Sequence, residues 1–321
     1  MELRFFHQNM RKWGGVSRTV DFTKAYGDMR YNGSMRDAIL VIAAGFTEIV
    51  NASDNTLTHL NEIAAKLAKK GVEMGPVYLT PAGVNQDYEV TEYIGVSLWS
   101  SATASAWGYC HLYKSTNVLR ADPKFFARSF IGKNQVLPKP PSQREEMLPN
   151  GATELWNLIP DYRGIAFVAA DLDARPFIVG FMHNVCQIGD PSISIKAMPQ
   201  AFTAIRDKVA AIYSEFQDAP IIVGGDFNVR PSKPSASQST TTIFPRAAAF
   251  KNPPPTYRNT TSANPLDFWF YNKKPFNIGK TIEPGNTDCF LHNEAFVGEY
   301  FTKNDNSVQL TDHMGISITV G

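Results

Sequence analysis

Two segments of the chain carry apolar residues at the three- and four-residue spacing of an amphipathic helix. The longer one begins near Ile195, and its apolar positions are Met198, Phe202, Ile205, Val209, Ile212 and Phe216. This spacing predicts a helix with one buried face, and Pro199 falls near its first turn, where proline is tolerated. The shorter segment, residues 57–67, is followed by two lysines and Gly71, as is typical of a helix C-terminus.

Strand patterns are more numerous than helical ones. Short apolar runs bounded by turn residues occupy residues 93–99, 109–114, 164–169, 177–182, 220–223, 266–271 and 315–320. Strand and helix do not alternate regularly, which disfavours a single parallel, doubly wound sheet. The pattern predicts an α/β sandwich with mixed or mainly antiparallel sheets and helices on the outside.

Composition narrows the class of protein further. The 321 residues are 43% apolar and 19% charged, so the chain can bury a sizeable core and is not disordered. The net charge of +1 gives no support to a strongly basic body that coats nucleic acid. No run approaches the roughly 20 apolar residues of a membrane span. The proline-rich loops are too short to be convincing linkers, so we expect one domain over residues 1–321.

The sharpest local motif is the run Ile-Ile-Val-Gly-Gly-Asp-Phe-Asn at residues 221–228. An apolar strand runs into two glycines, which allow close approach to the backbone. In an extended chain, Asp226 and Asn228 would then point to the same face. An ordinary turn after a strand is the alternative interpretation.

Similar polar positions occur at other apolar runs. Asp312 and His313 precede the last strand, and Asn9 follows the first one. Glu48 is the one carboxylate of an apolar run, where an unpaired charge is expensive. Each position alone is also explained as a turn, edge or core residue.

A further strand ends on His183 and Asn184. The combined set contains Asp, Glu, Asn and His, and no cysteine. Hard oxygen ligands with two histidines indicate Mg²⁺-type chemistry on a phosphate rather than a zinc or iron site.

In their order along the chain, these motifs resemble the signatures of the endonuclease/exonuclease/phosphatase superfamily. The resemblance spans residues 3 to 320 and includes Asn264-Pro-Leu-Asp267 before the penultimate strand. It implies a four-layer α/β sandwich, in which two mixed β-sheets pack face to face with helices outside. The active site would lie at one end of this sandwich.

The resemblance also implies roles for the catalytic residues. His313, oriented by Asp267, would be the general base or a phosphate-contacting imidazolium. His183 would be the partner acid or a donor to phosphate oxygens. Asp226 and Asn228 would orient the attacking water or the phosphate, or hold a second ion.

Metal and phosphate ligands follow from the same resemblance. The expected cofactor is Mg²⁺, with Mn²⁺ as a substitute, and its ligands would be Glu48, Asn9 and Asp312. The expected phosphate-binding residues are Arg163, Tyr109 and Asn184.

Two positions depart from the family pattern. Trp107 stands where DNase I-like members carry a glutamate, so the carboxylate partner of His183 is left open between Glu92 and Asp87. Arg11 stands close behind Asn9, where many members have an acidic residue or glutamine. This base either weakens a second metal position or contacts phosphate.

The resulting functional hypothesis is a metal-dependent phosphoesterase, with a nuclease acting on DNA or RNA as the first choice. A phosphatase or phospholipase acting on phosphoinositide or sphingomyelin is the alternative, and an inactive phosphate-recognising binding module is a third. Low charge content and abundant Asn, Ser and Thr favour an exported protein whose leader was removed, with a cytoplasmic protein as the alternative.

Overall fold

The computed structural model describes only part of the chain. The described residues are 2–13, 39–50, 54–67, 73–75, 77–84, 90–115, 118–125, 163–184, 192–228, 246–247, 257–258, 263–264, 266–271, 291–292, 313 and 315–320. The helices in these ranges are α3 (Asp54–Leu67), α4 (Ser192–Ala210) and the 3₁₀ turn η3 (Ser214–Phe216). The strands are β1 (Glu2–Trp13), β2 (Ile39–Ile49), β3 (Tyr78–Val84), β4 (Val90–Leu98), β5 (Thr103–Ser115), β6 (Val118–Phe125), β7 (Gly164–Asp171), β8 (Pro176–His183), β9 (Ile221–Asp226), β10 (Arg246–Ala247), β11 (Tyr257–Arg258), β12 (Ala263–Asn264), β13 (Asp267–Tyr271), β14 (Leu291–His292) and β15 (Ile316–Val320).

The strands form two mixed sheets. One has six strands in the order β14-β15-β1-β2-β4-β3, and the other has seven in the order β10-β13-β9-β8-β7-β5-β6. Each sheet has one parallel pair, β1 with β2 in the first and β8 with β9 in the second, and its other pairs are antiparallel. The short strands β11 and β12 pair separately.

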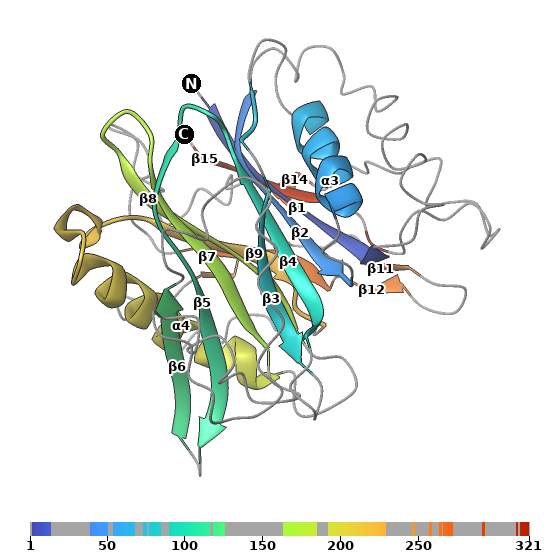
Figure 1. The fold of residues 1–321 in the computed structure, drawn as a ribbon. Coiled ribbons are helices and arrows are strands. Elements are labelled where there is room, and N and C mark those ends of the chain that lie inside the picture. Colours follow the sequence, from blue (N-terminus) through green and yellow to red (C-terminus); the bar gives the residue numbers. More distant parts are fainter. Residues whose placement is uncertain are drawn as a thin grey trace.

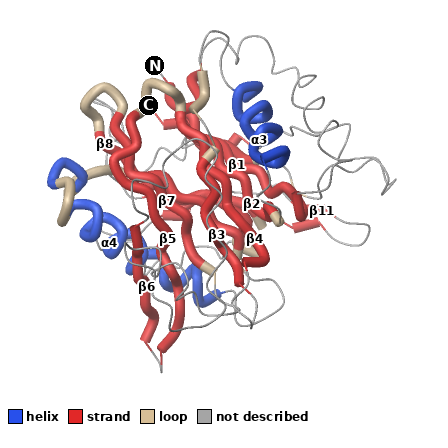
Figure 2. Tube along the Cα trace, in the orientation of Figure 1, coloured by secondary structure: helices blue, strands red, loops and turns tan. Residues whose placement is uncertain are grey.

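The two sheets pack face to face, and a helix lies outside each of them (Figures 1 and 2). Strands β2 and β4 contact β8 across the interface, α3 contacts β2 and β4, and α4 contacts β5 and β6. The layers are therefore helix, sheet, sheet and helix. This confirms the predicted fold class, while the expectation of a single domain stays a prediction.

Strand β7 illustrates how the sequence builds two cores. All but the last of its residues are buried, so it reads as a continuous apolar run. Ala166 and Val168 belong to the core between the sheets, whereas Ile165 and Phe167 belong to the core under α4. Alternate side chains of a strand point to opposite faces, so a strand covered on both sides must be apolar throughout.

The longer helix differs from its prediction at both ends. It starts at Ser192, which places Pro199 inside the helix rather than in its first turn. It ends at Ala210, and the amides of Ile212 and Tyr213 both donate to Val209 O in a closing turn. Ile212 therefore leaves the buried face and is 61% exposed. The last apolar position of the pattern, Phe216, is buried from the separate turn η3.

Neither α3 nor α4 is long and apolar enough to cross a membrane, and these are the α-helices in the described part of the chain.

Buried His111 of β5 gives stability a pH dependence away from the candidate site. Burial lowers its pKa to about 4, against the attraction of Asp122. Below pH 6.5 the unfolded chain therefore gains a proton that the folded chain refuses, and stability falls as the pH drops from 6.5 towards 4.

We expect urea unfolding at pH 7 and pH 4.5 to show that His111→Gln reduces the acid loss of stability by about 2 kcal/mol. His59→Gln, on the outer helix α3, is the matched control and should leave the loss unchanged. Equal losses in wild type and His111→Gln would contradict this assignment.

Candidate active site

The seven-stranded sheet aligns three predicted site residues. Asp226 ends β9 and is in register with His183 of β8 on one side and with Asp267 of β13 on the other. In-register neighbours on adjacent strands point to the same face of a sheet. Strand pairing alone therefore brings these three side chains together.

Two glycines make the pairing around β9 close. A Cβ at Gly224 would collide with the ring of Trp269, and one at Gly225 would collide with the main chain of Met182. Both β13 and β8 thus approach β9 through positions that only glycine fits. The sequence predicted that some group would approach the backbone at these glycines, and in the structure that group is the neighbouring strand on each side.

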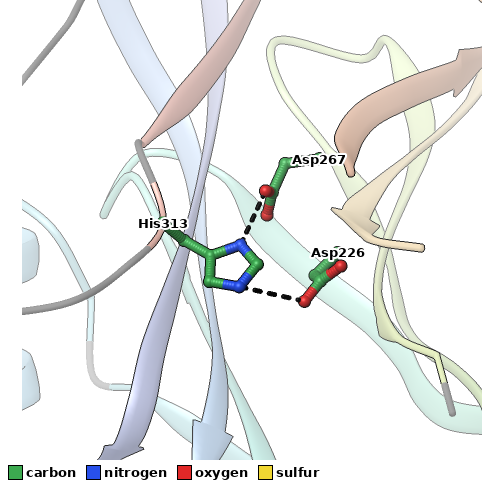
Figure 3. A group of neighbouring side chains, drawn as sticks. All are labelled: Asp226, Asp267 and His313. Carbon is green, nitrogen blue, oxygen red and sulfur yellow. Dashed lines mark hydrogen bonds and ion pairs between the residues drawn. The ribbon is translucent and has the colours of Figure 1, made fainter. Parts of the chain in front are cut away.

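Asp226, Asp267 and His313 form one group (Figure 3). His313 Nδ1 lies 2.7 Å from Asp267 Oδ2, and its Nε2 lies 3.5 Å from Asp226 Oδ2. All three residues are buried. Asp267 therefore fixes the orientation of the ring and leaves Nε2 facing the second carboxylate.

His183 lies on the other side of Asp226 and is held in a similar way. Its Nδ1 lies 2.7 Å from Glu92 Oε1, and its Nε2 lies 3.2 Å from Glu48 Oε1 and 3.7 Å from Asp226 Oδ2. Of the two candidate partners left open by the sequence, Glu92 is the one in contact. Asp87 lies outside the described residues.

Arg163 extends this arrangement through Glu92. Its guanidinium lies 3.0 Å from Glu92 Oε2 and donates to Ala82 O at 3.4 Å. A Cβ at Gly83 would overlap this guanidinium, so the glycine makes room for it. Tyr109, which is buried, donates its hydroxyl to the same Ala82 carbonyl at 3.1 Å. The phosphate-binding roles of Arg163 and Tyr109 stay predictions.

The six-stranded sheet supplies Asn9 and Glu48. Asn9 donates from Nδ2 to Asp226 Oδ2 at 3.0 Å, and its Oδ1 accepts from the Arg11 amide at 2.8 Å. The Lys12 amide donates to Glu48 Oε2 at 3.1 Å. Arg11, Lys12 and Glu48 all have positive φ, between 47° and 57°. Such strain in non-glycine residues commonly gathers at functional sites.

Asn228 does not extend the strand face of Asp226 as the sequence argument assumed. Strand β9 ends at Asp226, and Asn228 has a left-handed backbone with φ of 52°. Its amide nitrogen donates to Asp226 Oδ1 at 2.9 Å, and its side chain donates to Asn184 O at 2.8 Å. This is the turn that the sequence left open as the alternative, and it braces the Asp226 carboxylate.

Asn184 also supports the loop after β9. Its side-chain Nδ2 donates to Phe227 O at 2.9 Å, and its main-chain N–H donates to Asp226 O at 2.8 Å. Its phosphate-binding role stays a prediction. The same is true of the metal-ligand role of Asp312, which lies outside the described residues.

His183 and Asp226 end neighbouring strands, and different groups shift their pKa values. Burial alone lowers the pKa of His183, but the carboxylates of Glu92, Glu48 and Asp226 outweigh it and raise the pKa to about 9. His183 is therefore an imidazolium near neutral pH. Burial raises the pKa of Asp226, and nearby Asp267 raises it further, while both imidazoles oppose this. A negative charge on Asp226 is thus costly without a nearby cation.

Glu92 responds in the opposite sense. Burial alone raises its pKa, but His183 and Arg163 outweigh this and lower it. Glu92 is therefore an anion that stabilises the charged form of His183.

His7, for which the sequence predicts no role, is fully buried next to this group. Burial lowers its pKa to about 3, so the ring is neutral. Its Nδ1 lies 3.9 Å from Asp267 Oδ1. A histidine inside an apolar strand is normally a core residue, so only the fold reveals this neighbour.

The donor set suits a divalent cation. Asp226, Asp267 and His313 offer ligand atoms that all lie within 4.8 Å of one another. Two further oxygen-bearing side chains lie beside Asp226: Asn9 bonds to Asp226 Oδ2, and Glu48 Oε1 shares the His183 Nε2 contact with it. Oxygen-rich sets of this kind are preferred by Mg²⁺ and Mn²⁺.

Comparison with known proteins gives the same class. The profile of the endonuclease/exonuclease/phosphatase family matches residues 41–313. TDP2 from Caenorhabditis elegans superposes with a TM-score of 0.50 and 12% identity, over 100% of this chain and 74% of that one. A mannosyl-6-phosphatase from Bacteroides thetaiotaomicron superposes with a TM-score of 0.49 and 12% identity, over 99% of this chain and 100% of that one. The human Nocturnin catalytic domain superposes with a TM-score of 0.49 and 10% identity, over 100% of this chain and 94% of that one. A search of curated protein sequences found no match.

Fold and site together define a DNase I-like α/β sandwich with an acidic, histidine-containing centre. The chain belongs to the endonuclease/exonuclease/phosphatase family, whose members are typically hydrolases that use divalent metals.

The contact between Glu92 and His183 can be tested by substitution. Glu92→Gln keeps the side-chain shape but removes the negative charge, so we expect the pKa of His183 to fall from about 9 by about 1 to 3 pH units. An NMR titration of the imidazole C–H protons measures this value. Glu62→Gln, on the exposed face of α3, should leave the His183 titration unchanged. An unaltered His183 titration in Glu92→Gln would exclude the pair.

Proposed function

We propose that this chain is a Mg²⁺- or Mn²⁺-dependent phosphodiesterase that hydrolyses DNA or RNA. One observation carries the proposal. The Nε2 atoms of two imidazoles lie 3.7 and 3.5 Å from the same oxygen of Asp226, Oδ2, and each ring is held through Nδ1 by a second buried carboxylate at 2.7 Å. Paired, oriented imidazoles are suited to giving and taking protons on opposite sides of one reacting phosphate.

The charge of the substrate determines what the site must supply. A phosphodiester is an anion and repels the attacking oxygen, so positive groups must neutralise it. A divalent metal, with Glu48, Asn9 and Asp226 as the proposed ligands, supplies Lewis-acid stabilisation of phosphate oxygen charge. His183, whose Nδ1 is paired with the Glu92 carboxylate, adds a protonated donor from the chain itself.

His313 is proposed as the general base. Asp267 accepts the Nδ1–H hydrogen bond and thereby fixes the tautomer that leaves Nε2 unprotonated. Nε2 then takes a proton from water as the water oxygen bonds to phosphorus. As the bond from phosphorus to the leaving oxygen breaks, His183 gives its proton to that oxygen. Charge and protons balance over the step.

The basic residues behind Asn9 support a polyanionic substrate. Arg11 and Lys12 follow Asn9 near the end of β1, where both have positive φ, and Lys12 is exposed. A nucleic-acid strand presents further phosphates beside the scissile one, which cationic side chains bind. Sphingomyelin carries one phosphate, and a phosphoinositide carries its phosphates on one ring rather than along a strand.

The first test is the cleavage of supercoiled plasmid. We expect nicking with Mg²⁺ or Mn²⁺ that stops with a chelator. His183→Ala and His313→Ala should each lower the rate by at least about 100-fold, because acid–base groups contribute about that much. His59→Ala, on α3, is the matched control and should keep full activity.

A substrate panel separates the alternatives. Cleavage of phosphoinositide or sphingomyelin with plasmid left intact would contradict the nuclease and retain the phosphoesterase. Failure to cleave plasmid, abasic duplex or either lipid with any divalent ion would overturn the enzymatic proposal and favour a phosphate-binding module.

A further inference from the structure

His7 connects the two sheets at a point that the proposed mechanism does not use. Its Nε2 lies 3.1 Å from Thr47 Oγ1 on β2, and its Nδ1 lies 3.9 Å from Asp267 Oδ1 on β13. The other oxygen of Asp267, Oδ2, lies 2.7 Å from His313 Nδ1. The two oxygens of one carboxylate therefore face two different imidazoles.

The plane of the His7 ring is restrained by its neighbours. It stacks on Phe181 with ring centroids 6.2 Å apart and an interplanar angle of 18°. Gly45 is in register with His7, and a Cβ there would collide with the Phe181 ring. Phe181 thus occupies space that only glycine leaves open, and the His7 ring is fixed from one face.

The two ring nitrogens of His7 face different groups, and together these favour one tautomer. The buried Thr47 hydroxyl can donate to Nε2 or accept from it, so this 3.1 Å contact fits both tautomers. The Asp267 carboxylate only accepts, and its Oδ1 faces Nδ1, which favours the proton on Nδ1 and leaves Nε2 to accept from Thr47. Nδ1 has no hydrogen-bond partner among the described residues and faces Asp267 Oδ1.

We propose that His7 is a positioning residue for the Asp267–His313 pair, with Thr47 holding its Nε2 in place. The Nδ1–H dipole faces the Asp267 carboxylate and favours the rotamer that presents Oδ2 to His313. At 3.9 Å this is a charge–dipole contact rather than a hydrogen bond, but it lies in fully buried surroundings, where such contacts are little screened. The proposal rests on the function proposed above for His313.

The first test does not need activity. With only six histidines in the chain, ¹⁵N-histidine labelling allows the imidazole signals to be assigned by single substitutions. We expect His7 to carry its proton on Nδ1, and the His313 Nδ1–H signal to shift in His7→Phe. A proton on His7 Nε2, or an unchanged His313 signal in folded His7→Phe, would overturn the proposal.

The second test separates positioning from stability. His7→Phe keeps the stacked ring and loses the N–H, so we expect kcat on plasmid to fall about tenfold or more with little change in KM. His7→Gln keeps a donor and an acceptor and should recover part of the rate. Thr47→Val should show a smaller loss, and the double variant should lose no more than His7→Phe alone, because Thr47 acts through His7.

Thr80→Val is the matched control. Thr80 is also a buried threonine, and its hydroxyl accepts a 2.7 Å hydrogen bond from Trp107 within the core. It should lower stability while leaving kcat and the His313 signal unchanged. Additive losses in the double variant, or full kcat in folded His7→Phe, would contradict the proposal. If plasmid is not cleaved by wild type, the labelling experiment alone decides.

Discussion

Buried negative charge is the constraint on which this site depends. Four carboxylates, three of them buried, meet at the ends of the central strands; they are Glu48, Glu92, Asp226 and Asp267. Charges removed from water are tolerated only where opposite charges and hydrogen bonds compensate them. The two imidazoles and Arg163 do part of this. Burial and nearby Asp267 raise the pKa of Asp226, so its charge is still costly, and a cation bound beside it would offset that cost.

The fold meets this constraint by drawing each group from a different strand end. β8, β9 and β13 supply His183, Asp226 and Asp267 in one row, and the facing sheet supplies Asn9 and Glu48. Because every group sits on a rigid strand or beside one, the hydrogen bonds at 2.7 Å are maintained by the sheets themselves. The positive-φ residues of the site lie near the ends of β1 and β2 and just after β9.

The sequence predicts which residues gather at the site better than it predicts the contacts between them. Polar residues next to apolar runs predicted that Asp226 and His313 would lie in one cluster, and the structure brings them together, while their catalytic roles stay predictions. Asn228 was misjudged because the extended-chain argument holds only while the strand continues, and β9 stops two residues earlier. The helix prediction overran Ala210 for the same reason: periodicity does not mark where a turn closes.

Other features depend on pairing that a single sequence does not contain. Glu92 contacts His183 because β4 pairs with β2 and packs on β8, and nothing local distinguishes Glu92 from a surface glutamate. His7 is similar, since an apolar strand around a histidine predicts a core residue. Its relation to Asp267 appears only when β1 faces the seven-stranded sheet.

The central claim is that the metal lies beside Glu48 and leaves His313 free to move a proton. Anomalous diffraction from crystals soaked in Mn²⁺ tests this directly. The account predicts a manganese peak in contact with Glu48 and Asp226, with the Asp267–His313 hydrogen bond intact. A peak bound by His313 Nε2 between Asp226 and Asp267, or no peak at saturating Mn²⁺, would contradict it.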